Sequence, residues 1–388
     1  MKLIKNAKIK TMAGTDIPCG MILISDDGKI AKIGAKFDFD AEACEIIDAE
    51  GRLTTPGLID AHDHAGIDDT AVRWEGADHN EYSDPITPHL RAIDGIYPQD
   101  EAFANAVAGG LTAACIGPGS ANVVGGSFAV VKLSGVSIDD MTVKSPAAMK
   151  CAFGENPKGA YGQNGRKAPY TRMGVAAMLR ELLFKSKKYL EDKESGKDVA
   201  FDMKLEAMIP VIKGEIPLKA HAHRADDILT AVRIAKEFGV KLTLDHCTDG
   251  SIVAKQLGEA GFPAIVGPTI TSKTKRELVN KSFDTLKDLY NAGVEIAIIT
   301  DAPVIPLERL PLCAAMAVGA GLPEEEGWRA ITSNPAKFLG VDDRIGTLEV
   351  GKDADIVIWS DDPLHEVSAT PVFTLIDGKI VYSKESKI

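Results

Sequence analysis

The sequence predicts an α/β fold, in which a (β/α)8 TIM barrel fills the middle of the chain and both chain ends form a small β-sandwich. Strand-like and helix-like segments alternate through the middle, short strands with tight turns occupy both ends, and histidines or an aspartate follow several middle strands. The length of 388 residues is enough for a large barrel and a small second domain. We expect residues 1–54 and 342–388 to form the β-sandwich domain and residues 55–341 to form the barrel.

Both ends of the chain have the pattern of hairpins. Near the N-terminus, apolar runs at 21–24 and 30–33 flank the sequence Asp-Asp-Gly at 26–28, a turn that needs positive φ. Near the C-terminus, residues 355–359 are strand-like, and residues 372–382 form a second hairpin about Asp-Gly. A sheet of a few strands is only marginally stable by itself, so the two ends most simply pair with each other.

Eight strands are expected between these ends, and the helical segments between them favour a parallel sheet with crossover helices. The helix predicted over 226–238 has one apolar stripe and a glycine directly after it as a C-cap. In such a barrel the chemistry lies at the C-terminal ends of the strands. Two long inserts, 65–110 and 154–172, each follow a strand, and we expect them to wall or cover the mouth of the active site. The expected strands are 57–62, 111–117, 127–134, 147–153, 216–221, 241–246, 263–267 and 294–300.

Composition excludes several classes of protein. The net charge is −12 and no basic stripe is visible, which argues against a nucleic acid partner. The six cysteines are scattered without a C-x-x-C pair, so reduced thiols are expected. No signal peptide or long apolar span is visible, which favours a bacterial-type cytoplasm and no membrane partner. We expect a homo-oligomer that acts on a small-molecule substrate.

Potential metal ligands stand at the ends of the predicted strands. His62 and His64 are two residues apart, a spacing that puts both imidazoles on one face of a strand, where they can share an ion such as zinc. By itself this pair is a weak signal, and two histidines in a surface loop are the plainer interpretation. His221 and His246 end the fifth and sixth strands, and Asp301 follows the eighth. A lone buried histidine is more often a core residue, but this collection favours a metal site.

Two signatures at opposite ends of the chain resemble those of the amidohydrolase superfamily. The segment Pro56–His64 (PGLIDAHDH) resembles its first-strand signature, and Thr332–Gly340 with Gly346–Asp355 resembles its closing signature. More closely, the chain resembles the imidazolonepropionase-related and prolidase-like branch. The resemblance implies the same barrel and sandwich, and it gives catalytic roles to Asp301, as the proton acceptor for the attacking water, and to His246. The metal ligands that it implies are His62, His64, His221, His246 and Asp301.

Five such groups exceed what one four-coordinate zinc ion needs beside its water, so we expect two divalent ions, zinc first and manganese or iron as alternatives. Two ions need a bridging group. We prefer Glu155, because Gly154 and the Asn-Pro pair at 156–157 form a tight turn that can present it. The alternative is Lys150, which resembles the lysine that is carboxylated to a carbamate in several branches. For either residue, an ordinary ion pair at the barrel rim is the plainer interpretation.

These features favour a metal-dependent hydrolase that cleaves an amide or cyclic amide C–N bond. The closest rival is a deaminase of a nitrogen heterocycle, and a third possibility is a catalytically inactive scaffold. Family deaminases and imidazolonepropionases usually carry a glutamate three residues after the strand-five histidine. Arg224 stands at that position here, which counts against both. Scaffold relatives lose metal ligands, whereas this chain keeps the full set.

The segments after the fourth and fifth strands are locally basic, although the protein is acidic overall. An arginine suits a carboxylate because its planar fork binds both oxygens. We therefore expect Arg224, and also Arg172, to bind a carboxylate on the substrate, unless these charges only pair with nearby acidic groups. The other cations in these segments are Lys158, Arg166 and Lys167.

Three further histidines lie after the fifth strand or in the first insert. His223 lies two residues after His221, so it is either a ligand, a substrate contact or a packed side chain. His79 and His89 lie in the first insert, where we expect structural or exposed histidines with a smaller chance of contact from a lid.

Overall fold

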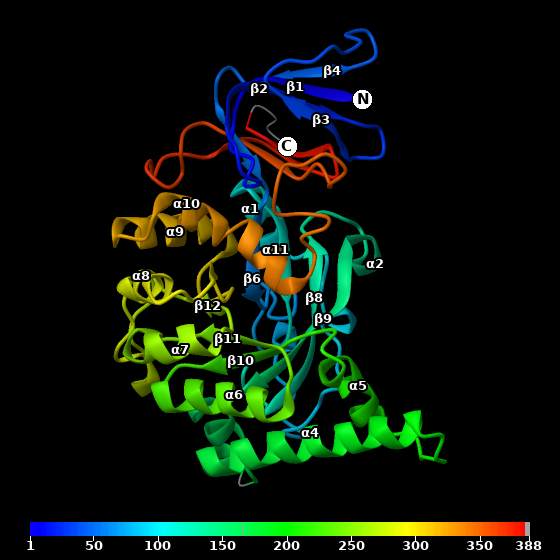
Figure 1. The fold of residues 1–388 in the computed structure, drawn as a ribbon, viewed down its shortest axis with the longest axis vertical. Coiled ribbons are helices and arrows are strands. Elements are labelled where there is room, and N and C mark those ends of the chain that lie inside the picture. The colour runs from blue at the N-terminus through cyan, green and yellow to red at the C-terminus, as the bar shows by residue number, and fades with distance from the viewer. Residues whose placement is uncertain (166, 385–388) are drawn as a thin grey trace.

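The computed structural model describes residues 1–165 and 167–384. A sheet built from the two chain ends lies at one end of the long axis of the molecule, and the barrel occupies the rest (Figure 1). The helices α6, α7, α8 and α9 are stacked along one side of the barrel, and the long helix α4 lies at the end remote from the terminal sheet (Figure 1). The fold therefore agrees with the predicted class.

The two chain ends pair into one sheet of eight strands, as predicted. The central contact joins β5 to β14, antiparallel, with Thr55 opposite Val357. Both predicted hairpins form, β2 with β3 and β15 with β16. Gly28 in the first turn has a φ of 80°, and a Cβ there would lie 2.3 Å from the carbonyl oxygen of Asp377 in the second turn, so the close approach of the two turns requires glycine. The strands are β1 (Lys2–Ile9), β2 (Ile17–Ile24), β3 (Ile30–Gly34), β4 (Glu45–Asp48), β5 (Leu53–Pro56), β14 (Ile356–Trp359), β15 (Pro371–Ile376) and β16 (Lys379–Ser383).

The middle of the chain forms a second sheet of eight strands that follow one another in chain order. Each overlaps a strand expected from the sequence. The last strand returns to the first, where the backbone N–H of His64 donates to the carbonyl oxygen of Ala302 at 2.8 Å, so the barrel is nearly closed. The strands are β6 (Leu58–Asp63), β7 (Leu111–Ile116), β8 (Val124–Lys132), β9 (Thr142–Ala152), β10 (Leu218–Ala222), β11 (Leu242–His246), β12 (Ala264–Val266) and β13 (Ile296–Ile298).

One strand departs from the prediction of a parallel sheet. β8 runs antiparallel to both of its neighbours, β7 and β9. The reason lies in the connections, which span only residues 117–123 and 133–141. A parallel crossover needs about a dozen residues or more, usually with a helix, whereas antiparallel neighbours need only a short loop. The prediction was wrong for this strand.

Helices cover the outside of the barrel. The predicted helix is α6 (Ala225–Phe238), which buries Ile228, Ala231 and Ala235 and ends at Gly239 in the left-handed conformation. The other helices are α1 (Glu101–Ala108), α2 (Ile138–Met141), α3 (Glu155–Pro157), α4 (Arg172–Glu194), α5 (Met203–Ile212), α7 (Ala254–Ala260), α8 (Asp284–Asn291), α9 (Leu310–Gly319), α10 (Glu324–Arg329) and α11 (Ser333–Leu339). Among the described residues, none of the helices is both long and apolar enough to cross a membrane.

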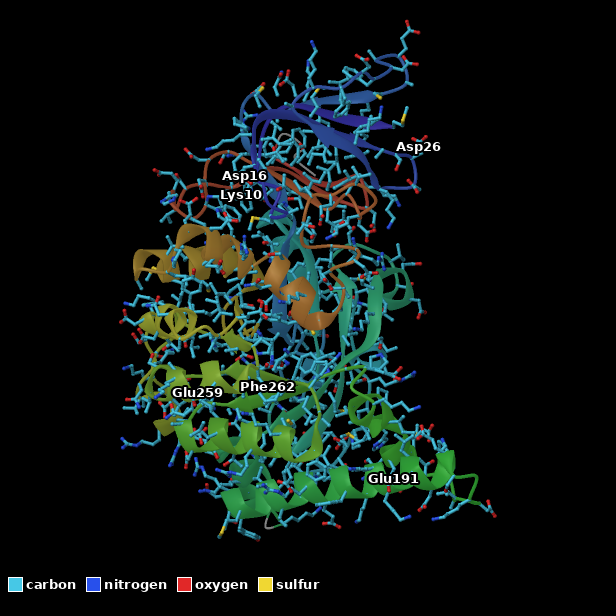
Figure 2. The ribbon with its side chains drawn as sticks, viewed as in Figure 1. Lys10, Asp16, Asp26, Glu191, Glu259 and Phe262 are labelled. Carbon is cyan, nitrogen blue, oxygen red and sulfur yellow. The ribbon has the colours of Figure 1, made fainter. Side chains whose placement is uncertain are left out.

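Ion pairs connect the terminal sheet to the barrel. The buried Lys132 ammonium of β8 lies 2.6 Å from a carboxylate oxygen of Asp355, just before β14. At the surface, Lys10 lies 3.0 Å from Glu325 of α10 and 3.6 Å from Asp16 (Figure 2). These contacts fix the sheet against the barrel, while the boundaries of 1–54, 55–341 and 342–388 as separate domains stay a prediction.

Candidate metal centre

Two clusters of ligand atoms lie at the C-terminal ends of the barrel strands. In each cluster the ligand atoms all lie within 4.8 Å of one another. The clusters adjoin, because the ring centroids of His62 and His246 are 5.1 Å apart. The first cluster consists of His62, His64 and Asp301, and the second of His221, His223 and His246.

Every histidine of the two clusters is oriented by a hydrogen bond at Nδ1. This leaves Nε2 as the atom that faces the other ligands, which is the usual arrangement when a second partner orients a metal-binding imidazole. The Nε2 atom of His246 is buried and has no hydrogen-bond partner in the described part of the chain. An unpaired buried polar atom costs about 1–3 kcal/mol, so a bound cation suits this position. The Nδ1 partners are the Asp245 carboxylate (2.5 Å) for His62, the Gly117 carbonyl (2.7 Å) for His64, the Ser120 hydroxyl (2.8 Å) for His221, the Thr248 hydroxyl (2.8 Å) for His223 and the Gly267 carbonyl (2.8 Å) for His246.

Asp301 lies beside the first two histidines. Its Oδ1 is 3.5 Å from Nε2 of His64 and 3.8 Å from Nε2 of His62. Burial raises the pKa of the Asp301 carboxyl, but His246, His64 and His62 outweigh burial and hold the pKa well below its usual range. The side chain is therefore an anion at neutral pH, able to bind a cation or to accept a proton. Asp301 and His246 both have positive φ, 56° and 72°, a conformation that is uncommon for residues other than glycine and is often retained at functional sites.

Lys150 of β9 reaches the same group of side chains from inside the barrel. Its Nζ lies 3.1 Å from Nε2 of His62, and the residue is fully buried. Burial lowers the pKa of this ammonium to about 8, although Asp245 and Asp301 act in the opposite direction. Within 1–165 and 167–384, no carboxylate lies within 4.0 Å of it. A buried amine with no close counter-ion is costly, which makes this position unusual.

Glu155, the other bridge candidate, belongs to neither cluster. It begins α3 at the mouth of the barrel, its side chain is 33% exposed, and Oε1 lies 4.0 Å from the ammonium of Lys275. Its neighbour Asn156 reaches the ligands instead, with Nδ2 3.2 Å from Nε2 of His221. The tight turn thus directs the asparagine inward.

A cavity of about 590 Å³ opens over the two clusters, a size that suits a small molecule. Both long inserts contribute to its wall, as expected. His64, His221, His223 and Asp301 line it; the first insert supplies Asp68, His79, Asn80 and Tyr82, and the second supplies Glu155, Asn156, Gly159, Ala160 and Asn164.

The two arginines expected at the substrate lie outside the lining of this cavity. Arg172 pairs with Asp227 at 2.9 Å and with Glu277 at 2.7 Å. Arg224 is 44% exposed and pairs with Asp226 at 2.9 Å. Arg166 lies outside the described residues. Lys158 and Lys167 are also absent from the lining.

Two cavity residues carry chemistry that is hard to select from local sequence patterns. His79 lines the cavity, with its ring 5.9 Å from that of His64 and Nδ1 3.5 Å from Asp68. Lys275 lies after β12 and is the one lysine or arginine in the lining among the residues that the structure describes. Both stand in irregular segments, where hydrophobic periodicity says nothing about direction. His89 does not line the cavity.

Comparison with known proteins agrees with this geometry. The sequence model of the Amidohydrolase family matches residues 202–382. The crystal structure of an amidohydrolase from Thermotoga maritima MSB8 is 42% identical, covers 99% of this chain and 100% of its own, and superimposes with a TM-score of 0.94.

Several curated relatives match over most of this chain. The amidohydrolase tasK of Hapsidospora irregularis is 31% identical over 92% of this chain, which spans only 39% of that longer protein. The imidazolonepropionase of Maricaulis maris is 29% identical over 92% of both chains.

Proposed function

Since the chain belongs to the amidohydrolase superfamily, we propose that it hydrolyses an amide or cyclic amide C–N bond of a small substrate with the help of bound divalent metal ions. The observation that carries the proposal is the pair of adjoining ligand clusters beneath a cavity of about 590 Å³. Imidazole nitrogens and a carboxylate are ligands that zinc prefers, and manganese or iron also accept them.

Each cluster would hold one ion. His62, His64 and Asp301 supply the first site, and His221 and His246 supply the second. His223 offers a third imidazole to the second site and also faces the cavity, where it can contact the substrate.

Of the two candidate bridges, Lys150 has the better position. Its Nζ already lies against His62, whereas Glu155 lies at the cavity mouth. In the carboxylation step the neutral amine attacks CO2, a new N–C bond forms and the displaced proton leaves to water. The resulting carbamate would replace an uncompensated cation with an anion and would offer two oxygens as metal ligands. We therefore favour carboxylated Lys150 as the bridge.

The reaction needs a water that loses a proton and a nitrogen that gains one. Divalent ions in such a site lower the pKa of water towards about 7 and polarise a carbonyl group. Asp301 is ionised and faces the cavity, so it can accept the proton from the attacking water and pass it to the leaving nitrogen. The Nε2 atom of His246 is buried and has no hydrogen-bond partner among the described residues, which supports its place in the second ligand cluster.

Deamination is the weaker alternative. A deaminase must deliver a proton to a ring nitrogen, usually from a glutamate three residues after the strand-five histidine. Arg224 occupies that position and pairs with Asp226 outside the cavity lining. The same departure weakens an imidazolonepropionase assignment, although enzymes with that name are among the relatives.

A substrate screen tests the proposed reaction. The zinc-loaded protein should release amines from N-acyl amino acids or dipeptides, or open cyclic ureides or imidazolones, and should release no ammonia from aminopurines or cytosines. Ammonia release from the heterocycles alone would replace the proposal with deamination. If the protein binds two ions and turns over none of these substrates, the proposed function is contradicted.

Asp245 should matter for metal affinity without touching the ion. It accepts from His62, and Lys219 lies 3.0 Å from it, with all three side chains fully buried. Asp245→Asn should weaken zinc retention about 10–100-fold, because the asparagine orients the imidazole less firmly and leaves Lys219 without its counter-ion. The amount of zinc that each protein retains during titration with a chelator measures this change in affinity. The control is Asp226→Asn, which changes an exposed carboxylate outside the cavity lining and should retain zinc as wild type does. Equal zinc retention in the two variants would refute the role of Asp245.

A further inference from the structure

We propose that Lys275 binds a carboxylate of the substrate, and that this carboxylate lies next to the scissile bond, as it does in N-acyl amino acids and dipeptides. The inference rests on the proposed hydrolase function and names its substrate class. It transfers to Lys275 the role that the sequence suggested for Arg172 and Arg224.

The first step of the argument is the availability of the ammonium group. Lys275 follows β12 and is 29% exposed at the cavity wall. Its Nζ donates to Oδ1 of Asn156 at 2.9 Å. The nearest carboxylate oxygen, Oε1 of Glu155, is 4.0 Å away, too far for a hydrogen bond. An ammonium has further N–H donors, and in the described part of the chain they have no hydrogen-bond acceptor. Those donors can bind an incoming anion.

The second step is the distance from the chemistry. Asn156 accepts from Lys275 through its oxygen, and its Nδ2 lies 3.2 Å from Nε2 of His221. One side-chain amide thus separates the ammonium from a ligand atom of the second cluster. An anion bound to Lys275 would therefore lie close to the second ligand cluster, where the proposed hydrolysis takes place. An α-carboxylate next to the scissile nitrogen is always close to the scissile carbonyl group and so meets this condition. A carboxylate on a long flexible arm is not held at that distance.

The third step is the charge of the wall. The described lining contains the carboxylates of Asp68, Glu155 and Asp301, and Lys275 is the one ammonium or guanidinium among them. Around it the lining supplies neutral hydroxyl groups from Thr271, Ser272 and Thr274. Among the charged side chains of the described lining, Lys275 is the one that attracts a substrate anion, whereas the three carboxylates repel it, and this contrast favours one orientation of the substrate.

A structural role for Lys275 is the competing interpretation, since its bond to Asn156 joins two loops. Matched substrates separate the two interpretations. We would measure kcat and KM of the zinc-loaded protein with a panel of N-acetyl-L-amino acids and their neutral amides, in wild type, Lys275→Met and Lys275→Arg. Lys273→Met is the control, because Lys273 lies in the same loop, donates to the Val279 carbonyl and is absent from the cavity lining.

The expected result is a loss of preference for the acid form. Lys275→Met should raise KM for the acids at least about tenfold, the effect of losing one charged hydrogen bond, while leaving the amides nearly unchanged. Lys275→Arg should restore part of the preference, and Lys273→Met should behave as wild type. A uniform loss for acids and amides would mean a structural role and overturn the proposal, as would wild-type protein that cleaves both forms equally well.

Binding separates this inference from the proposed function. Calorimetric titration with the same N-acetyl-L-amino acids does not depend on turnover. Binding that requires Lys275, without cleavage, would support carboxylate binding by Lys275 and contradict the proposed hydrolysis of N-acyl amino acids. Cleavage of amides, without preferential binding of acids, would be consistent with the proposed hydrolase function and would overturn carboxylate binding by Lys275. Absence of both binding and cleavage would overturn the proposed carboxylate binding by Lys275.

Discussion

Replacement of Lys150 by alanine should remove most of the bound metal and reduce turnover by more than about 100-fold. Carboxylated Lys150 is the proposed bridge, and changes to groups that merely orient metal ligands already cost about 10–100-fold. The side chain is fully buried, and its Nζ lies 3.1 Å from Nε2 of His62. Elemental analysis and the rate for the best substrate measure the two effects, and circular dichroism verifies the fold.

Glu155→Gln is the control, because both residues were candidates for the bridge but occupy different positions in the site. Glu155 lies at the cavity mouth 4.0 Å from Lys275, so this variant should keep its metal. Added bicarbonate or a short acid such as acetate should partly restore Lys150→Ala by supplying a carboxylate. The reverse pattern, with metal lost only in Glu155→Gln, would return the bridge to Glu155. Full metal content in both variants would exclude either bridge.

Replacement of Asp301 by asparagine should lower turnover by about 10²–10⁴-fold, the usual contribution of a general base. The amide oxygen can still face His64 and His62, so much of the metal should remain. It cannot accept the proton of the attacking water. Steady-state kcat, normalised to measured metal content, isolates this effect from metal loss. A kcat within a few-fold of wild type would exclude Asp301 as the proton acceptor.

Much of the fold followed from local patterns. The alternation of apolar segments and the Asp-Gly turns placed all eight barrel strands and both terminal hairpins. The direction of β8 could not be predicted in this way, because the apolar pattern of a strand is the same for a parallel and an antiparallel neighbour. The short connections before and after it carried the missing information, because they leave no room for a crossover.

The candidate ligands were accessible to sequence reasoning for a related reason. His62, His64, His221, His246 and Asp301 lie at or just after strands, and the barrel brings the ends of its strands together. The substrate side was harder to predict, because charges in loops depend on partners that are distant in sequence. Arg172 is occupied by Asp227 and Glu277, and Lys275 meets Asn156 across more than a hundred residues.

The metal content of the protein tests the central claim most directly. Wild-type protein, expressed with zinc and purified without chelator, should contain about two divalent ions per chain, because the two ligand clusters adjoin and each offers three ligand atoms. His62→Ala and His246→Ala, one from each cluster, should each lower that number. Less than half an ion per chain in the wild type, with no activation by added zinc, manganese or iron, would contradict the account.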